Sequence, residues 1–128
     1  MRLLLDTCTF LWLAADDAQL TARARSVCRS PDNDVFLSAL CAWEISIQHR
    51  LGRLPLPESP VRFVVSRREA LQLEPLSFDE SSAAHEGLLP PHHRDPFDRG
   101  LIAQAIVNGM TLVTPDPIIA RYPVPTLW

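Results

Sequence analysis

Four acidic side chains are the residues of this sequence best suited to catalysis: Asp6, Glu44, Asp98 and Asp116. They are spread over almost the whole chain, so only folding could bring them together. A cluster of carboxylates with no lysine or cysteine ligands nearby is what a hard divalent cation such as Mg2+ requires. Such a cation can lower the pKa of a water and neutralise charge that develops on a phosphate. These residue types therefore indicate metal-assisted phosphoryl chemistry.

The elements that would position these acids are strands alternating with helices. Short apolar runs predict strands at residues 3–5, 35–37, 71–73 and 111–114, followed by an apolar tail at 124–128. Helices are expected at residues 9–15, 22–29, 39–50, 61–70, 78–87 and 96–108. Thr21, Ser38 and Asp95 are suited to cap three of these helices. The alternation predicts one domain over residues 1–128, a three-layer α/β/α fold with a mainly parallel sheet.

The four acids are expected to meet at one edge of this sheet. In a parallel sheet every strand ends, and every following helix begins, at the same edge, where open α/β folds bind their ligands. Asp6 follows the first predicted strand and Asp116 follows the last. Glu44 lies less than two turns into the helix after the second strand, and Asp98 lies in the first turn of the helix that leads to the last strand. The connection rules alone therefore predict a shared site.

Each acid also has a structural explanation. Asp6 could cap the helix that follows it, Glu44 could be a solvated helix residue, and Asp116 could be a turn residue. Asp95 and Asp98 could be the N-cap and N3 residues of one helix. Capping is the preferred role for Asp95, whereas both roles are compatible for Asp98. The convergence of the four positions is the evidence for a site.

A second group of candidate residues precedes the helix that contains Asp98. His92 and His93 are adjacent in a loop, do not share a face and lack a third ligand at metal-binding spacing. A solvated loop is the default interpretation, and substrate contact by Arg94 or Arg99 is a secondary hypothesis.

The apolar residues of the helix at 39–50 predict which of its faces is buried. A buried stripe is expected at 3-4-4 spacing, formed by Leu40, Trp43, Ile47 and Leu51. Trp43, like Trp12 and Trp128, is expected in the core or in a partner interface.

The composition is that of an ordinary globular protein: 47% of the 128 residues are hydrophobic and 21% are charged. All 12 basic residues are arginine, which either reflects coding bias or suits phosphate contacts. The three cysteines form no CxxC pair, so a reducing compartment is expected rather than a disulfide framework. The apolar runs are too short for a signal peptide or a membrane span, so we expect a cytoplasmic protein without membrane contact.

Four ordered motifs that run from end to end of the chain resemble the PIN-domain ribonucleases, and more narrowly the VapC toxins of bacterial type II toxin–antitoxin systems. The motifs are Leu3–Thr7; Ser38–Leu40 with Trp43–Ile45; His93–Arg99 with Leu101–Ala105; and Leu112–Asp116. The ending at residues 121–128 also resembles that subgroup. One departure is Cys8, which stands where a histidine is common.

The resemblance implies a PIN-like fold and Mg2+- or Mn2+-dependent endonucleolytic cleavage of RNA, leaving a 5′-phosphate and a 3′-hydroxyl. It also implies a small antitoxin protein that binds across or near the active site, and commonly a homodimer. The acidic set of the family falls on Asp6, Glu44, Asp98 and Asp116. Of these, Asp6, Asp98 and Asp116 would hold the ion, and Glu44 would help to hold it or orient the attacking water.

Three alternatives stay open. A nuclease of the same family could process housekeeping RNA or cut DNA, and a non-catalytic PIN module could bind a partner only. A phosphatase with Asp6 as nucleophile would need a second acid two positions later, where Cys8 stands.

Overall fold

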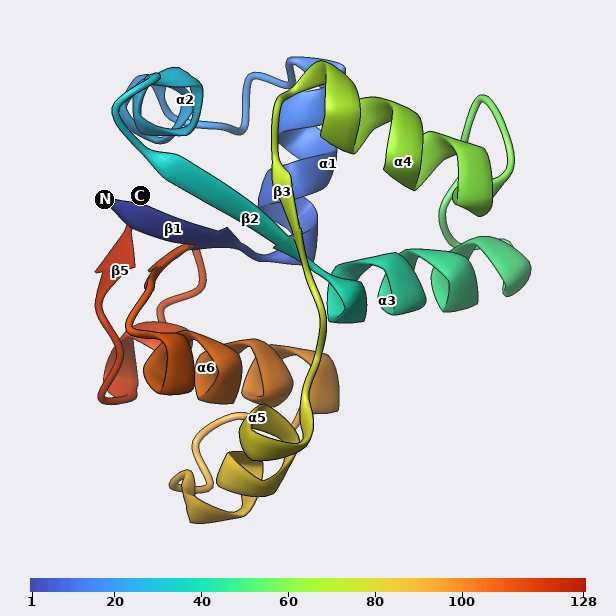
Figure 1. Ribbon diagram of the computed structural model, residues 1–128. Helices are drawn as coiled ribbons and strands as arrows, with labels where there is room; N and C mark the ends of the chain where they lie inside the picture. The colour runs from blue at the N-terminus through green and yellow to red at the C-terminus, as the bar shows by residue number, and fades with distance from the viewer.

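The computed structural model describes residues 1–128 and contains a five-stranded sheet (Figure 1). The strands are β1 (Arg2–Leu5), β2 (Asp34–Ser38), β3 (Glu74–Leu76), β4 (Thr111–Val113) and β5 (Thr126–Leu127). Their order is β3-β2-β1-β4-β5, and every neighbouring pair is parallel. This confirms the predicted three-layer α/β/α architecture, with a wholly parallel sheet.

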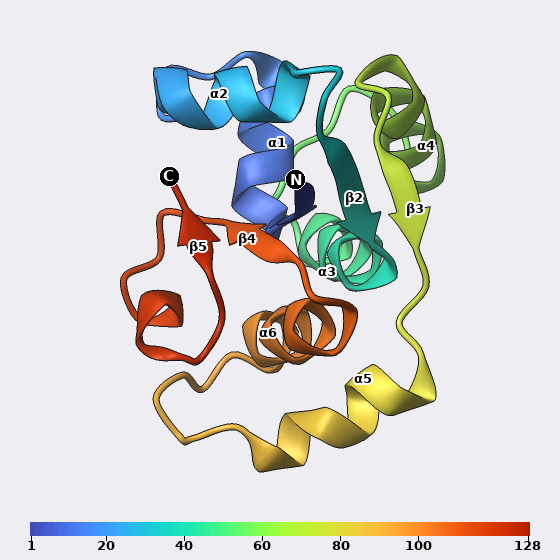
Figure 2. The same cartoon turned by 60° about the vertical axis from the view of Figure 1, so that its left-hand side comes forward.

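Six helices and two 3-10 turns connect the strands. They are α1 (Thr7–Ala15), α2 (Ala22–Arg29), α3 (Ala39–Arg50), α4 (Pro60–Ala70), α5 (Glu80–His85), η1 (Glu86–Leu88), α6 (Pro96–Asn108) and η2 (Ile119–Arg121). In both views α1, α2 and α4 lie on one side of the strands, and α5 and α6 lie on the other (Figures 1 and 2). Helix α3 continues from β2 beyond the carboxyl end of the sheet. None of these helices has the length and apolar character needed to cross a membrane.

Local capping signals explain where several helices begin. The side chains of Thr21, Ser38 and Asp95 accept hydrogen bonds from backbone N–H groups in the first turns of α2, α3 and α6. Each bond satisfies a backbone donor that has no partner within the helix. These three caps were predicted from the sequence and are confirmed.

The central strand β1 and its neighbour β4 are deeply buried. Leu3, Leu4 and Leu5 of β1, and Leu112 and Val113 of β4, are each 0% exposed. Burial on both faces is the property expected of strands inside a parallel sheet covered by helices. These residues belong to one hydrophobic cluster of 27 buried residues, so the middle of the sheet is also the centre of the core.

The strand order reverses between β1 and β4. From β1 the chain proceeds through β2 to β3, whereas β4 and β5 lie on the other side of β1. The helices that leave β1 and those that arrive at β4 therefore cover opposite faces and leave a crevice at the carboxyl edge. Because Leu5 is paired with Val113, Asp6 and Thr114 follow the two strands side by side in this crevice.

The third strand lies three residues later than predicted. Helix α4 is capped at Leu71, and Gln72 adopts a left-handed conformation with φ 57°. The N–H groups of Leu71 and Leu73 bond to carbonyl groups of the last turn of α4. The apolar run at 71–73 therefore closes the helix, and β3 begins only at Glu74.

The apolar tail contains a fifth strand that the sequence did not predict. Thr126 and Leu127 pair with Leu112 and Val113 at the edge of the sheet. Asp116 consequently follows the next-to-last strand rather than the last. Two residues are too few for a periodic pattern to identify a strand.

The buried face of α3 is rotated from the predicted one. The residues that are buried are Leu40, Cys41 and Ile45, whereas Trp43 is 61% and Leu51 50% exposed. Cys41 faces the end of β1, because its thiol lies 3.6 Å from the carbonyl oxygen of Leu5. Trp43 and Leu51 matched the helical period of a buried stripe, but the smaller Cys41 lies on the face that is actually buried.

The other two tryptophans lie where they were expected. Trp12 and Trp128 pack against each other with ring centroids 5.8 Å apart, and both adjoin the hydrophobic core.

Replacing Gly109 with alanine should destabilise the protein by about 1 kcal/mol, because Gly109 ends α6 with φ 64°, where a Cβ is strained. Urea denaturation would measure the loss. Gly87→Ala is the matched control, since a Cβ there meets no atom within 4 Å and the backbone has an ordinary φ. Equal stabilities of the two variants would contradict the assignment of strain to Gly109.

A four-carboxylate candidate active site

The carboxyl edge of the sheet contains a cavity of about 180 Å³ that all four predicted acids line. Asp6 comes from the end of β1, Glu44 from α3, Asp98 from the first turn of α6, and Asp116 from the segment after β4. Thr7 and Cys8 complete the lining. The structure therefore brings together the acids that the connection rules placed at one edge.

Asp6 is both the N-cap of α1 and a wall of the cavity. Its Oδ1 accepts a hydrogen bond from Thr9 N at 2.9 Å, and its Oδ2 accepts one from the hydroxyl of Thr114 at 2.5 Å. The residue is only 4% exposed. The structural and functional explanations therefore coexist, and the cap fixes the carboxylate in one orientation.

Glu44 is held by the residue that follows Asp6. The hydroxyl of Thr7 donates a hydrogen bond of 2.5 Å to Glu44 Oε1. Burial raises the pKa of Glu44, with smaller contributions in the same direction from Asp95 and Asp6, while the bond from Thr7 lowers it. Glu44 is not a solvated surface residue but a half-buried acid aimed at the site.

Asp116 is fixed by a turn in which its own backbone takes part. Its Oδ1 accepts from Ile118 N at 2.8 Å, and its N–H donates to the hydroxyl of Thr114 at 3.1 Å. Since Thr114 also donates to Asp6, one hydroxyl connects two acids of the site. Thr114 was not identified from the sequence, although its position directly after a buried strand matches that of Asp6.

Asp95 and Asp98 have different roles. Asp95 Oδ1 accepts from Phe97 N at 2.8 Å, as expected of an N-cap, and Asp95 does not line the cavity. Asp98, three residues later, does line it. The preference for Asp95 as the cap and Asp98 as the site acid agrees with this geometry.

His93 is the site residue that the sequence interpretation missed. Its Nε2 lies 2.8 Å from Asp116 Oδ2 and 3.1 Å from Asp98 Oδ2, and its side chain is only 14% exposed. Each of these three residues offers one nitrogen or oxygen that could bind a metal ion, and these three atoms lie within 4.8 Å of one another. The expected solvated loop is therefore wrong for His93, whereas His92 is exposed. No periodicity directs a side chain in an irregular loop, so only its proximity to the α6 cap could have signalled it.

Arg99 holds the loop before α6 and is not available to a substrate. Its Nε donates to Glu86 Oε1 at 2.5 Å, and its Nη1 donates to the carbonyl of Pro90 at 2.9 Å and to the hydroxyl of Tyr122 at 3.3 Å. The substrate contact considered for Arg99 is thus replaced by a structural role. Arg94 is exposed to solvent.

The neighbouring acids and burial change the pKa of Asp98. Burial, as the largest cause, and the charge of Asp95 raise the pKa of Asp98 to about 7, although His93 partly offsets them. Glu44 and Asp6 contribute in the same direction as Asp95. Without a bound cation, Asp98 therefore keeps its proton to a higher pH than an ordinary aspartic acid does.

The donor set fits a hard divalent cation. Four carboxylates supply oxygen ligands, which Mg2+ and Mn2+ prefer. Cys8 does not alter this chemistry, because burial and the neighbouring Asp6 raise the pKa of its thiol. The thiol donates toward Asp6 Oδ1 at 3.3 Å, so it is present as S–H rather than as a thiolate ligand.

A groove of about 230 Å³ continues from the acid cavity. It shares Thr7, Cys8 and Glu44 with the cavity and extends between α1 and α3 to Arg53. Arg53 is exposed, and its guanidinium group makes no hydrogen bond or ion pair within the chain. The groove therefore links an acidic end to a basic end.

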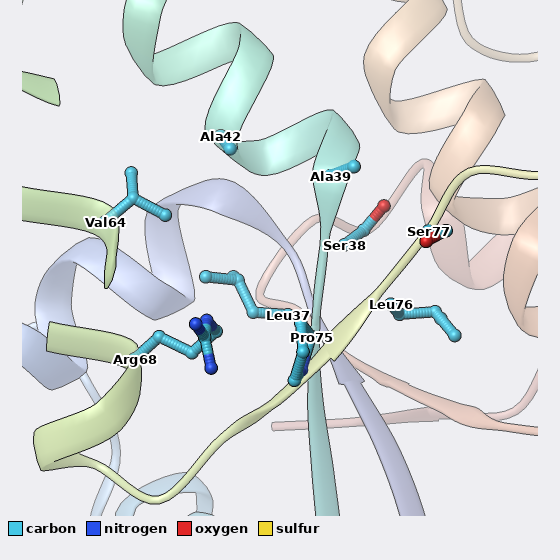
Figure 3. Close-up of a pocket in the computed structure, with 9 residues that line it drawn as sticks. All are labelled: Leu37, Ser38, Ala39, Ala42, Val64, Arg68, Pro75, Leu76 and Ser77. Carbon is cyan, nitrogen blue, oxygen red and sulfur yellow. The ribbon is translucent and has the colours of Figure 1, made fainter. Parts of the chain in front are cut away.

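A different cavity, between α4 and the edge of the sheet, has no such chemistry. Figure 3 shows Arg68 of α4 reaching toward Leu37 and Pro75 in this cavity of about 140 Å³. No carboxylate lines it. The acid cavity is thus the better candidate for catalysis.

Residues 3–125 match the PIN domain family. A segment of 73 residues is 41% identical to Ribonuclease VapC16 from Mycobacterium tuberculosis and covers 57% of this chain and 50% of that protein. The match thus spans about half the length of this curated relative.

Solved structures share the fold along nearly the whole chain. VapBC2 from Rickettsia felis, bound to a DNA fragment from its promoter, superposes with a TM-score of 0.72 at 18% identity, covering 99% of this chain and 98% of that one. DNA-bound VapBC from Salmonella typhimurium superposes with a TM-score of 0.70 at 18% identity, covering 99% and 97%.

Replacing Asp98 with asparagine should stabilise the metal-free protein at pH 8 by about 1–2 kcal/mol, after allowance for solvent screening. The folded carboxyl has a pKa of about 7, above the ordinary 3.8. Stability from the protonated form is therefore fully present below about pH 4 and is lost as pH rises toward 7, since the unfolded carboxyl ionises first. Denaturation in EDTA between pH 5 and pH 8 would measure it. A difference between variant and wild type that does not grow with pH would contradict this cause.

Proposed function

Because this chain belongs to the PIN domain family, we propose that it is a metal-dependent endoribonuclease and the toxin of a type II toxin–antitoxin system. The observation that carries the proposal is the set of four carboxylates around one cavity at the point where the strand order reverses. The name of the M. tuberculosis relative, a ribonuclease, supports the activity. The neighbours solved as VapBC complexes support an antitoxin partner.

Asp6, Asp98 and Asp116 would hold a Mg2+ or Mn2+ ion, directly or through water. Their carboxylates come from three separate segments, so the ion would also tie these segments together. When bound, the ion supplies an activated water and neutralises charge on the scissile phosphate. The retained proton of Asp98 would be released as the ion binds, which couples ion binding to pH.

The other residues of the site orient these groups. Thr114 keeps Asp6 and Asp116 in register through two hydrogen bonds. Thr7 aims Glu44 into the cavity, where Glu44 would help to hold the ion or orient the attacking water. The raised pKa of Glu44 suits a group that accepts a proton from that water.

The groove between α1 and α3 is proposed as the path of the RNA strand. The acid cavity would hold the scissile phosphate, and Arg53 at the far end would contact a neighbouring phosphate. Guanidinium groups suit such contacts because their donors match phosphate oxygens in pairs.

A protein partner is supported by an exposed apolar patch on the other side of α3. Trp43 packs edge-on against Phe97 with centroids 5.1 Å apart and is still 61% exposed. Together with Phe78 it lines a groove between α3, α5 and α6 of about 330 Å³. Exposed aromatic residues of this kind mark protein contacts, such as those of a homodimer or an antitoxin.

Asp6→Asn should reduce Mg2+-dependent RNA cleavage by about 100-fold or more, since it removes a charged ligand. Asparagine keeps the acceptor for Thr9 N, so the cap of α1 and the fold are retained. Asp79→Asn, at the exposed N-cap of α5, is the matched control and should cleave as wild type does. The assay uses purified, antitoxin-free protein, and equal cleavage by Asp6→Asn and wild type would refute the metal-site assignment.

The toxin role is tested in cells. Inducible expression of the wild type should arrest growth and generate new RNA 5′ ends, whereas Asp98→Ala should do neither. Cleavage without growth arrest would favour a housekeeping RNA-processing nuclease. Ion binding without any cleavage would favour a partner-binding module.

Arg53→Ala should weaken RNA binding about three- to tenfold and leave the rate of the bound complex nearly unchanged, because the contact lies away from the scissile phosphate. The slope of binding against salt concentration should also become shallower. Arg50→Ala is the control, since Arg50 is exposed three residues earlier and does not line the groove. Equal effects of the two substitutions would argue for general charge attraction instead of a defined path.

A further inference from the structure

His93 lies between two acids of the site in a way that offers two roles. Its Nε2 is 2.8 Å from Asp116 Oδ2 and 3.1 Å from Asp98 Oδ2. We propose that His93 is a hydrogen-bond donor that positions Asp98 and Asp116 and is not itself a ligand of the metal ion. The inference rests on the proposed metal binding, and it makes the site an all-oxygen one.

The ligand role is the obvious competitor. Imidazole is a frequent metal ligand, and His93, Asp98 and Asp116 offer atoms within 4.8 Å of one another. A neutral imidazole can bind a metal only through a nitrogen that carries no proton. The position of the proton on the ring therefore decides between the two roles.

The hydrogen bonds of the ring assign that proton to Nε2. The backbone N–H of Asp95 donates to His93 Nδ1 at 3.1 Å, so Nδ1 is the acceptor. In neutral imidazole the other nitrogen then carries the proton, and here that nitrogen faces two carboxylates. For Nε2 to bind an ion, the proton would move to Nδ1 and face the N–H of Asp95.

Hydrogen bonds hold the imidazole ring of His93 in this orientation. Asp95 is the N-cap of α6, so the peptide that donates to Nδ1 is fixed by the start of the helix. The N–H of His93 donates to the hydroxyl of Tyr122 at 2.7 Å, and that hydroxyl also accepts from Arg99. The Nδ1 end of the ring and the backbone of His93 are therefore held by groups other than the four site acids, while the Nε2 end faces Asp98 and Asp116.

A donor in this position stabilises the two carboxylates when no ion is present. It competes with an ion for the same oxygens, in contrast to a ligand, which adds an electron pair to the ion. Removing the donor should thus leave ion binding unchanged or tighter, because the freed carboxylate oxygens become available to the ion, whereas removing a ligand should weaken it.

Two substitutions separate the functions of the two ring nitrogens. In His93→Asn the amide oxygen can replace Nδ1 as the acceptor for Asp95 N–H, but nothing replaces Nε2–H. In His93→Gln the amide nitrogen can reach the place of Nε2 and donate to the carboxylates. Neither amide supplies the basic nitrogen that a ligand role needs.

The experiment combines calorimetric Mg2+ titration of both variants with 15N NMR of the imidazole of the wild type, with and without Mg2+. We expect His93 to keep its proton on Nε2 in both states. His93→Gln should bind Mg2+ within about threefold of wild type, and His93→Asn should bind equally or up to about tenfold more tightly. Transfer of the proton to Nδ1 on adding Mg2+, or a tenfold loss of affinity in both variants, would overturn the proposal.

Failure of the proposed function gives a different result. If the wild type binds no Mg2+, the metal-dependent activity is excluded, and a Zn2+ titration then decides the role of His93, because Zn2+ favours imidazole nitrogen. Zn2+ bound by the wild type but not by His93→Gln would identify a ligand. Zn2+ affinity that is equal in both would support the donor role.

Discussion

The parallel pairing of β1 with β4 is the constraint on which the rest of the site depends. It joins residues more than 100 positions apart and lies at the centre of the core, where neither strand exposes an apolar side chain. The register of this pair places Asp6 beside Thr114, whose hydroxyl then bridges to the backbone of Asp116. A shift by one residue would turn these side chains to the other face of the sheet. The buried leucines therefore set the geometry of the acids.

The burial that orders the acids also makes their ionised forms unfavourable. Asp98 is pushed toward its protonated form by the loss of water and by neighbouring negative charge. Hydroxyl and backbone donors compensate Asp6, Glu44 and Asp116, and His93 reaches the two acids nearest to it. These hydrogen-bond donors reduce the repulsion among the carboxylates. The carboxylates are consequently held in place, but their negative charge is not neutralised within the chain. A divalent cation would neutralise it.

Much of this arrangement follows from the sequence, and each exception has its own physical cause. Caps at Thr21, Ser38 and Asp95, and the edge on which the acids meet, depend on local signals and on connection rules, and these were predicted correctly. The face of α3, the start of β3 and the two-residue β5 were not. A tertiary contact overrode the helical period in α3, where Cys41 rather than Trp43 faces the sheet. The start of β3 was misplaced because residues 71–73 close α4, and β5 was missed because two residues show no period.

The error in the face of α3 also explains why Glu44 belongs to the site. With Trp43 buried, Glu44 would point along the flank of the helix, and its position among the acids would depend on its neighbours. With Cys41 against the end of β1, Glu44 lies three residues further on the same side and meets Thr7, the first residue of α1. The burial of Cys41 therefore turns the Glu44 carboxylate toward the site. It also leaves Trp43 exposed on the opposite side of α3, where it could contact another protein.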